Sequence, residues 1–335
     1  MLEIEAEIEK GIEEIKKRNA KLVAIQAPEG LKTKILEISV RIEEKTMAKT
    51  VAFVNPIFGS CMLADEASKK LGAELLLHFG HSQFFKNECV PTIYLPVKYA
   101  LPEEIKQLCF ELISKKLKEE KINSVGLAAT IQYLSYLSEL KVFLEKQGIQ
   151  AIIENGTNIS AGQILGCNYS VPLKEAEKAE CILYFGDGLF HPLGIAFSTD
   201  KRVFAASPLS VNIQELSQEK EKFLKKRLGL IATAMHAKNF GFLVSTEKGQ
   251  FGFRRAMQLK QKLEEQGKKA IIVVSDLIKP EYVLGIDVEF WVNTACPRIA
   301  TDDGMLFKQP VLTASELKIV LGEKKIEEYS VEEIV

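Results

Sequence analysis

Three of the six cysteines lie in stretches that favour metal binding over packing. Cys61, Cys167 and Cys296 each follow one or two small residues, in the stretches GSC, GC and AC. Small neighbours leave space beside a sulfur for an inorganic group. Three thiolates without an obvious fourth ligand can hold zinc with an open position, or three irons of a [4Fe–4S] cluster with the fourth iron open. The cluster is the better prediction, and because no short C-x-x-C pair is present, either site requires tertiary structure.

The other three cysteines have the surroundings of ordinary apolar residues. Cys89 follows a charged loop, Cys109 lies within an amphipathic segment and Cys181 begins an apolar run. A cysteine taken alone is most often an inert apolar residue, and we expect this of these three. Six cysteines in 335 residues are too sparse for a disulfide scaffold, so we expect reduced thiols.

Two histidines lie where an apolar run passes into a loop, in the stretch LLLHFGHSQFF. One interpretation is that His81, with Gly80 and Ser82, lines the same cleft as Cys61 and offers polar contacts to a ligand. The alternative is that each imidazole only hydrogen-bonds a neighbouring backbone group. Of the two, we expect His81 rather than His78 to face the cleft.

Two segments start a predicted helix directly after an apolar run, where backbone N–H groups can bind carboxylates or phosphates. Gly30 lies in APEGLKTKI, and Ser245, Gly249 and Gln250 lie in STEKGQFGF. Plain helix capping is the alternative at both positions. Neither segment is a P-loop or a GxGxxG motif, so neither carries a nucleotide-binding fingerprint.

Charged residues follow two further apolar runs. Asp187 and His191 lie in YFGDGLFHP, and Arg298 lies beside Cys296 in CPRIATDDG. Arg298 is suited to clamp a carboxylate with two hydrogen bonds, and an aspartate is suited to accept one from an amine. A solvated charged loop is the alternative.

The elements that must position these residues recur in a pattern. Short runs rich in Val, Ile, Leu and Ala alternate with segments of helical period, which is typical of buried parallel strands joined by helices. The predicted strands are 21–28, 50–56, 73–80 and 91–97 in a first repeat, 124–130, 149–156, 181–186 and 202–208 in a second, and 239–246, 269–276, 288–295 and 310–315 in a third. A long polar helix is expected from about Val211 to Lys238. The class is α/β, a triplicated Rossmann-like unit.

The repeats divide the chain into three predicted units, 1–103, 104–212 and 213–335, each with one of the three loop cysteines. The cysteines follow the second predicted strand of the first two repeats and the third strand of the last. Parallel strands place such loops at their carboxyl ends, so three similar parallel-sheet subdomains would allow one central site.

Nothing in the charge balance suggests a general nucleic-acid or membrane binder. There are 44 Lys and Arg against 45 Asp and Glu, for a net charge of -1. The N-terminal stretch is charged and amphipathic rather than an apolar signal, and no run approaches the roughly 20 apolar residues that span a bilayer. We expect a soluble cytoplasmic protein.

Five stretches together match a known family. They are PEGL (28–31), FGSCMLADEASKKLGAELLLHFGHS (58–82), GQILGCN (162–168), FGDGLFHPLG (185–194) and NTACPRIATDD (293–303). The chain thereby resembles the 2-(3-amino-3-carboxypropyl)histidine synthase family, which performs the first step of diphthamide biosynthesis. Two positions depart from the family pattern: Ser60 stands where alanine is common, and Met62 where an acidic residue is frequent.

The resemblance implies that Cys61, Cys167 and Cys296 hold one [4Fe–4S] cluster in a three-domain α/β fold, and that S-adenosylmethionine binds the open iron. In this family the reduced cluster cleaves the bond from sulfur to the methionine γ-carbon, giving a 3-amino-3-carboxypropyl radical and methylthioadenosine. The radical adds to the imidazole of one histidine of translation elongation factor 2. No catalytic residue beyond the cluster is expected.

The contacts to the co-substrate are expected from the strand-end loops, because the resemblance does not assign them residue by residue. We expect Arg298 and the helix start from Ser245 to Gln250 to bind the methionine carboxylate, and Asp187 or His81 to make further polar contacts. The archaeal branch of the family is homodimeric. Because this chain keeps all three cysteines, we expect a catalytic rather than an accessory subunit. We also expect a homodimer of the archaeal type and an unidentified electron donor.

Two alternatives stay open. Quinolinate synthase also triplicates an α/β unit around a three-cysteine [4Fe–4S] cluster, but it uses the open iron as a Lewis acid for dehydration. The GHS and ACPR stretches argue against it. The second alternative is a metal-binding accessory protein that makes no product, which would be favoured if the reduced protein failed to cleave S-adenosylmethionine.

Overall fold

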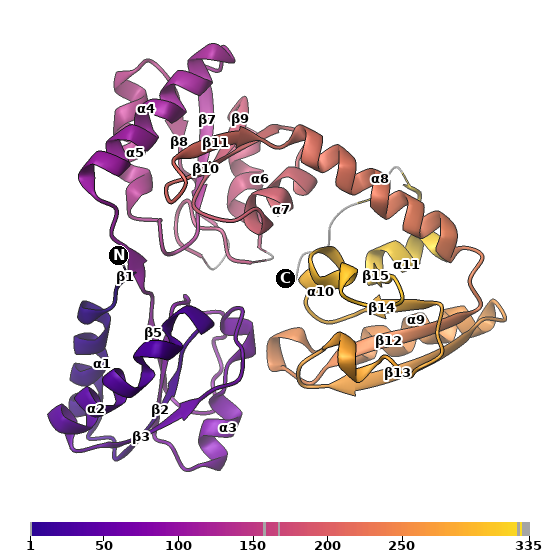
Figure 1. The fold of residues 1–335 in the computed structure, drawn as a ribbon, viewed down its shortest axis with the longest axis horizontal. Coiled ribbons are helices and arrows are strands. Elements are labelled where there is room, and N and C mark those ends of the chain that lie inside the picture. The colour runs from indigo at the N-terminus through magenta and orange to yellow at the C-terminus, as the bar shows by residue number, and fades with distance from the viewer. Residues whose placement is uncertain (1, 157–158, 167, 327–328, 330–335) are drawn as a thin grey trace. The chain divides into compact units, whose positions relative to one another are not determined.

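The computed structural model describes residues 2–156, 159–166, 168–326 and 329. The chain divides into two compact units, one of residues 1–106 with 130–136 and one of residues 107–129 with 137–335. Each unit consists of sheets flanked by helices (Figure 1).

The first unit is built on a four-stranded parallel sheet with the order β3-β2-β4-β5. Its strands are β2 (Leu22–Gln26), β3 (Lys49–Phe53), β4 (Leu75–Phe79) and β5 (Thr92–Leu95). Its helices are α1 (Glu5–Arg18), α2 (Ile35–Thr46) and α3 (Asp65–Lys70), with 3₁₀ turns η1 (Glu29–Lys34) and η2 (Ser60–Met62). A short antiparallel ribbon joins β1 (Leu2–Glu3) to β6 (Lys98–Tyr99).

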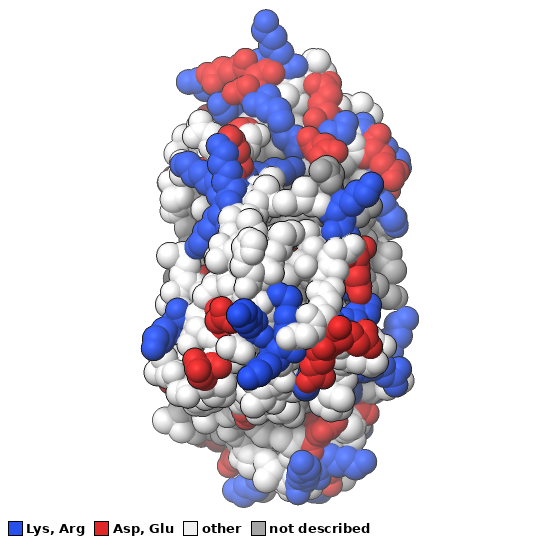
Figure 2. Space-filling model, turned by 90° about the vertical axis from the view of Figure 1, so that its right-hand side faces the viewer, with Lys and Arg blue, Asp and Glu red and all other residues white. Residues whose placement is uncertain are grey.

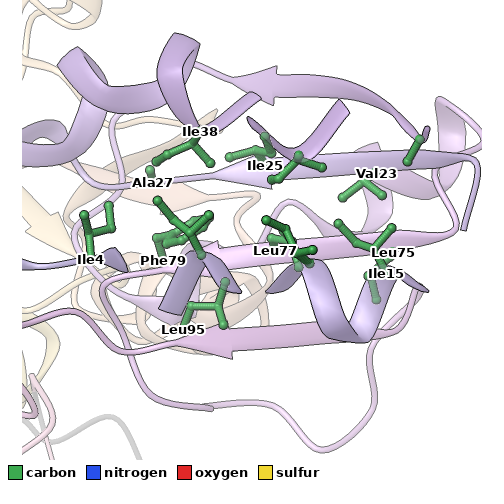
Figure 3. Packing of buried hydrophobic residues seen from close by; sticks show 14 of the residues in the cluster. Ile4, Ile15, Val23, Ile25, Ala27, Ile38, Leu75, Leu77, Phe79 and Leu95 are labelled. Atoms are coloured by element: carbon green, nitrogen blue, oxygen red, sulfur yellow. The ribbon is translucent and has the colours of Figure 1, made fainter. Parts of the chain in front are cut away.

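The core of the first unit lies between helices α1 and α2 and one face of this sheet (Figure 3). Strand β4 is buried along its whole length, as its continuous apolar run predicts for an interior parallel strand. Helix α1 buries three isoleucines at helical spacing, Ile8, Ile12 and Ile15. Gly11 lets this helix approach the sheet closely, because a Cβ atom there would lie 3.1 Å from the Leu77 side chain and 3.3 Å from that of Leu95.

The second unit contains two sheets. One has the order β11-β10-β9-β7-β8 and is parallel except for its edge strand β11. Its strands are β7 (Ser124–Ala129), β8 (Gln150–Ile152), β9 (Cys181–Phe185), β10 (Arg202–Ser207) and β11 (Asn212–Glu215). The accompanying helices are α4 (Glu103–Glu119), α5 (Tyr136–Lys146), α6 (Ser170–Ala176) and α7 (Phe190–Ser198).

The other sheet of the second unit is wholly parallel, with the order β13-β12-β14-β15. Its strands are β12 (Asn239–Ser245), β13 (Lys269–Ser275), β14 (Phe290–Asn293) and β15 (Val311–Thr313). The helices are α8 (Ser217–Ala234), α9 (Phe253–Glu265), α10 (Arg298–Thr301) and α11 (Ala314–Val320), with 3₁₀ turns η3 (Lys248–Gln250), η4 (Pro280–Tyr282) and η5 (Asp303–Met305).

The three sheets share one topology, which confirms the predicted α/β class with three similar parallel-sheet units. Numbered along the chain within each repeat, the strands lie in the order 2-1-3-4 in all three sheets, and β11 adds an edge to the middle one. Every strand predicted from the apolar runs is present. In such an order the connections leave the first and third strands in opposite directions, so their carboxyl ends open a crevice where α/β proteins bind ligands.

The helix predicted from Val211 to Lys238 is shorter than expected. Helix α8 begins at Ser217 and ends at Ala234, and residues Asn212–Glu215 form strand β11 instead. Val211 adopts a left-handed backbone conformation with φ 48°, which turns the chain back so that β11 pairs antiparallel with β10. A tight turn followed by strand pairing therefore overrides the polar, helix-like composition of this segment.

Helix α8 ties the two sheets of the second unit together. Its Phe223 stacks on Phe197 of α7, with ring centroids 4.3 Å apart. Its Arg227 is buried, donates from Nε to Oε1 of Glu316 at 2.7 Å, and donates to the backbone oxygens of Ala300 and Val311 at 3.0 and 2.9 Å. One helix therefore packs on the second repeat and bonds to the third.

The predicted boundaries of the three units, 103/104 and 212/213, stay predictions, because the sheets place the repeats but not the limits of independently folding domains. Within the described ranges, no helix is both long and apolar enough to cross a membrane. On the face drawn in Figure 2, positive and negative side chains are interspersed, in keeping with the net charge of -1.

Candidate functional site

Cys61 lies on the 3₁₀ turn η2, which follows strand β3. Its side chain is half-buried between the buried residues Ser60 and Met62. A Cβ atom at Gly59 would lie 3.5 Å from the Sγ of Cys61, so glycine keeps one side of the sulfur clear. This local geometry suits a thiolate that must remain accessible to a metal.

Two side chains hold the turn that carries Cys61 through three hydrogen bonds. The buried amide of Gln26, at the end of β2, donates to the Met62 oxygen at 2.8 Å and accepts from the Ala64 N–H at 3.1 Å. The Ser60 hydroxyl donates to the backbone oxygen of Ser82 at 2.7 Å. This hydrogen bond joins the turn to the loop after β4. Both ends of the thiol-bearing turn are therefore fixed to the carboxyl ends of neighbouring strands.

The two histidines of this loop are bonded to each other. The Nε2 atom of His78, on β4, lies 3.1 Å from Nδ1 of His81, and the Nδ1 atom of His78 lies 2.8 Å from Oε1 of Gln26. Burial lowers the pKa of His78 to about 3, with a smaller effect from His81. His81 is half-buried, and burial of its ring lowers its pKa to about 4. Both imidazoles are therefore neutral near pH 7.

Gly30 lies in a 3₁₀ turn rather than at the first residues of an α-helix. It is exposed in η1, and α2 begins only at Ile35. A Cβ atom at Gly30 would meet nothing within 4 Å, so the glycine is not required by packing. The predicted binding of an anion at Gly30 stays a prediction. The helical segment there begins with a 3₁₀ turn, and the α-helix follows only after it.

In the second repeat, Cys167 lies outside the described residues. The neighbouring Gly166 has a left-handed φ of 49°, which favours glycine directly before the cysteine. Asp187, in the loop after β9, accepts from the Ser207 hydroxyl at 2.6 Å and from the Leu209 N–H at 3.3 Å. One oxygen of this carboxylate therefore braces the turn after β10.

In the third repeat, Cys296 follows strand β14 and is half-buried. The buried Asn293, the last residue of that strand, donates to the Cys296 oxygen at 2.8 Å and accepts from the Ala295 N–H at 3.0 Å. The loop after β12 packs against this turn at Gly252, where a Cβ atom would lie only 2.0 Å from the Thr294 oxygen. A buried strand-end amide thus holds this cysteine turn, as Gln26 holds the turn of Cys61.

The predicted carboxylate-binding segment of the third repeat forms a tight turn beside β12. The Ser245 hydroxyl donates to the backbone oxygen of Asp276 at 2.8 Å and accepts from the backbone N–H of Glu247 at 3.1 Å. Gly249 and Gln250 lie in η3, and Gln250 is buried. The N–H groups of Thr246 and Gln250 donate to the backbone oxygens of Ser275 and Glu247, so several N–H groups of this turn are already hydrogen-bonded.

Arg298 brings the second and third repeats of the second unit together. Its guanidinium lies 4.4 Å from the ring centroid of Phe190 on α7, and its Nε lies 3.0 Å from Oδ2 of Asp302. Burial, with a smaller effect from Arg298, lowers the pKa of the neighbouring His191 to about 4. The strand-end loops of these two repeats therefore meet at this arginine.

Of the remaining cysteines, Cys109 and Cys181 behave as expected for packing residues, whereas the expectation is wrong for Cys89. Cys109 in α4 and Cys181 at the start of β9 are buried, and burial raises the pKa of both thiols, that of Cys181 to about 12. Cys89 is exposed, and its backbone N–H donates to Asp65. Within the part of the chain that the structure describes, no group of three Cys, His, Asp or Glu residues is placed to hold a metal ion.

Two residues that hold the cysteine turns, Gln26 and Asn293, escape the sequence-based prediction. The signal that could have found them is a single amide in the last position of an otherwise apolar strand, as in LVAIQ and FWVN. A polar side chain buried there must have hydrogen-bond partners, and these partners are the loops that follow neighbouring strands.

These features define an α/β protein with three repeats of one sheet topology, in which thiols lie in loops beyond the strand ends. Residues 27–330 match the model of the diphthamide synthesis protein family. The chain belongs to that family.

Similar proteins match over nearly the whole chain. The 2-(3-amino-3-carboxypropyl)histidine synthase of Pyrococcus horikoshii is 36% identical over 329 residues, which cover 97% of this chain and 92% of that protein. The protein of the same name from Methanocaldococcus jannaschii is 31% identical over 321 residues, covering 92% and 87%. The crystal structure of Dph2 from Pyrococcus horikoshii with a 4Fe-4S cluster has a TM-score of 0.89 at 34% identity, and the match covers 100% of this chain and 95% of that chain.

Proposed function

We propose that this chain transfers the 3-amino-3-carboxypropyl group of S-adenosylmethionine to a histidine of translation elongation factor 2, the first step of diphthamide synthesis. The observation that carries the proposal is the pairing of family membership with one small-residue-flanked cysteine in each of three like-folded repeats. The names of similar proteins support the same transfer.

Cys61, Cys167 and Cys296 are the proposed ligands of one [4Fe–4S] cluster. The chemistry of the donors fits, since Cys61 and Cys296 are half-buried thiols on anchored turns and Gly59 leaves the sulfur of Cys61 accessible. A reduced cluster with one open iron supplies the electron that cleaves the bond from the sulfonium sulfur to the γ-carbon of the co-substrate. The solved Dph2 structure contains a 4Fe-4S cluster, which supports a cluster of the same kind in this chain.

The protein's own residues bind and orient the co-substrate and keep water from the reacting carbon. Arg298 is the proposed partner of the methionine carboxylate, with its guanidinium already oriented by Phe190 and Asp302. The segment from Ser245 to Gln250 is proposed as a second contact to the same carboxylate. Gly30 and Asp187 are proposed as further contacts from the first and second repeats.

The proposed partners follow from the reaction. Elongation factor 2 is the protein substrate, an external donor supplies the electron, and the working form is a homodimer. Light scattering during size-exclusion chromatography checks the last point, because a homodimer would have twice the mass of the 37.5 kDa chain.

The decisive experiment is anaerobic reconstitution with iron and sulfide, followed by reduction and incubation with S-adenosylmethionine and elongation factor 2. The expected products are methylthioadenosine and a histidine whose mass has increased by one 3-amino-3-carboxypropyl group. Release of 5'-deoxyadenosine instead would refute the mechanism. Failure of the reduced protein to consume S-adenosylmethionine would favour a non-catalytic metal-binding protein.

A further inference from the structure

A buried polar network lies at the crevice between the first and third strands of the first sheet. Gln26 on β2 and His78 on β4 are register partners at the carboxyl ends of these strands. Both side chains are buried, with 3% and 0% of their surface exposed. Buried polar groups in such a place are retained only with well-defined hydrogen bonds, so the direction of each bond can be worked out.

The orientation of the Gln26 amide is fixed by two backbone groups. Its nitrogen faces the Met62 carbonyl at 2.8 Å, which can only accept, and its oxygen faces the Ala64 N–H at 3.1 Å, which can only donate. The oxygen of Gln26 therefore also acts as the acceptor at its 2.8 Å contact with His78, so Nδ1 of His78 carries the hydrogen.

The same logic extends one residue further. A neutral His78 with a protonated Nδ1 has a bare Nε2, which must accept at its 3.1 Å contact with Nδ1 of His81. The neutral form of His78 follows from its burial, as described above. His81 therefore carries its hydrogen on Nδ1 and leaves Nε2 as a lone pair, two residues beyond the end of β4.

We propose that Gln26 and His78 are positioning residues that hold His81 in its Nδ1–H tautomer, so that its bare Nε2 accepts a hydrogen bond from the α-ammonium group of the co-substrate. This inference rests on the proposed function for the identity of the ligand. A bare imidazole nitrogen can only accept, so it cannot bind the carboxylate of an amino acid, whereas a cationic N–H donor makes a strong charge-assisted bond to it. The Gln26 amide also holds the turn of Cys61. The same side chain therefore fixes the position of the thiol-bearing turn and the tautomer of His81.

The first arm of the test reads the tautomer directly. Nitrogen NMR of the full chain labelled at histidine, prepared anaerobically, should show His81 protonated on Nδ1 and bare on Nε2. Gln26→Glu places a carboxylate beside Nδ1 of His78 and should favour its imidazolium form, whose Nε2–H then forces His81 into the Nε2–H tautomer. His78→Phe should leave His81 as a mixture of tautomers.

Four histidines make the assignment simple, and His236→Gln, at an exposed position, serves as the control that leaves the His81 signals unchanged. An Nε2–H tautomer in the parent protein would overturn the inference. An unaltered His81 tautomer in both Gln26→Glu and His78→Phe would do the same. Neither tautomer measurement depends on turnover. If the protein produced no methylthioadenosine, the proposed function would be refuted, but the inferred tautomer of His81 would still be tested by the NMR measurement.

The second arm reads the ligand. With reconstituted protein, His81→Phe and Gln26→Glu should weaken equilibrium binding of S-adenosylmethionine about tenfold. Binding of an analogue with hydrogen in place of the α-ammonium group should change less than twofold. His236→Gln should bind both as the parent protein does. Equal losses for the two ligands, or no loss for either, would overturn the assignment of the α-ammonium group to His81.

Discussion

Cys61 and Cys109 are the same residue type in opposite surroundings. Cys61 lies half-buried on a turn with a glycine beside its sulfur, whereas Cys109 is buried in helix α4. Burial raises the pKa of the Cys109 thiol, and Asp187 adds to the shift. Because the thiolate is the form that binds metal, Cys109 is a poor ligand.

We therefore predict that Cys61→Ala abolishes the visible absorbance of the reconstituted protein, while Cys109→Ala keeps it. The second substitution should cost about 1 kcal/mol of stability through lost packing. Absorbance and bound iron after reconstitution measure the difference. Equal loss of colour in both variants would show that the ligand set has been wrongly chosen.

Glu175, on α6, is a carboxyl group in an apolar setting. Its side chain is fully buried, and Oε1 accepts from the Glu154 N–H at 3.2 Å. Oε2 has no hydrogen-bond partner among the residues that the structure describes. Burial raises the pKa of Glu175 to about 9, well above the ordinary value of 4.5 for a glutamate. The folded protein thus keeps a proton that the unfolded chain releases, and stability falls as pH rises from 4.5 towards 9.

We predict that Glu175→Gln removes this pH dependence, because glutamine keeps the acceptor oxygen and cannot ionise. The variant should match the parent protein near pH 5 and exceed it by about 2 kcal/mol near pH 7. Urea unfolding at a series of pH values measures the effect. The matched control is Glu177→Gln, an exposed position on the same helix end, which should leave the slope as it was. Identical slopes for Glu175→Gln and the parent would contradict the buried, protonated state.

For individual residues, the sequence predicts which side chains belong to the candidate site better than it predicts their hydrogen-bond partners. Ser60 departs from the family pattern, and the structure gives it a role, since its hydroxyl bonds to Ser82 and joins the cysteine turn to the histidine loop. Met62 is buried, and its backbone oxygen, not its side chain, accepts from Gln26. Such contacts join residues 22 and 36 positions apart, so no local pattern can contain them.

The strands are the elements that the sequence predicts most completely. Interior parallel strands are buried on both faces, so they read as continuous apolar runs, and each predicted run is a strand. The strands that escaped prediction are β1, β6 and β11, which are short and antiparallel. Their stability comes from a neighbouring strand rather than from their own composition, and composition therefore gives no sign of them.

The residue type at one loop position is determined by the close approach of two loops to each other. Gly252, at the start of α9, has backbone angles open to any residue, with φ -105° and ψ 22°. It is required because a Cβ atom there would lie 2.0 Å from the backbone oxygen of Thr294, two residues before Cys296. Any side chain at this position must displace the turn that carries the cysteine.

We predict that Gly252→Ala destabilises the protein by about 3 kcal/mol and lowers iron retention. Gly229→Ala is the matched control, because Gly229 lies exposed within α8 with nothing within 4 Å of a Cβ atom. It should stabilise the protein by about 0.5–1 kcal/mol. Thermal unfolding and iron content measure both, and a harmless Gly252→Ala would mean that the two loops are not in contact.

At the scale of the second unit, helix α8 is the element that joins two sheets. Arg227 and Glu316 are both buried and bonded to each other, and Glu316 also accepts from the backbone N–H of Thr313. A charge left alone in this place would have no solvent to stabilise it. Neither residue is marked in the sequence as anything but a surface charge on a helix, because its partner lies 89 positions away.

We predict that Arg227→Met lowers the free energy of unfolding by about 3–5 kcal/mol, since it strands the carboxylate of Glu316. The double variant Arg227→Met with Glu316→Gln should recover a large part of that loss. Urea denaturation of the single and double variants measures the recovery. A double variant that is less stable than Arg227→Met alone would contradict an unpaired charge as the cause.

The shared strand order also bears on how the chain can fold while it is being synthesised. In each sheet the strand made first becomes an interior strand, the second and third pair on either side of it, and the fourth pairs with the third. Strand β11 likewise pairs with β10, which precedes it. Every later strand of each sheet is thus added beside a strand that has already been synthesised, so each sheet can assemble from the N-terminus onward.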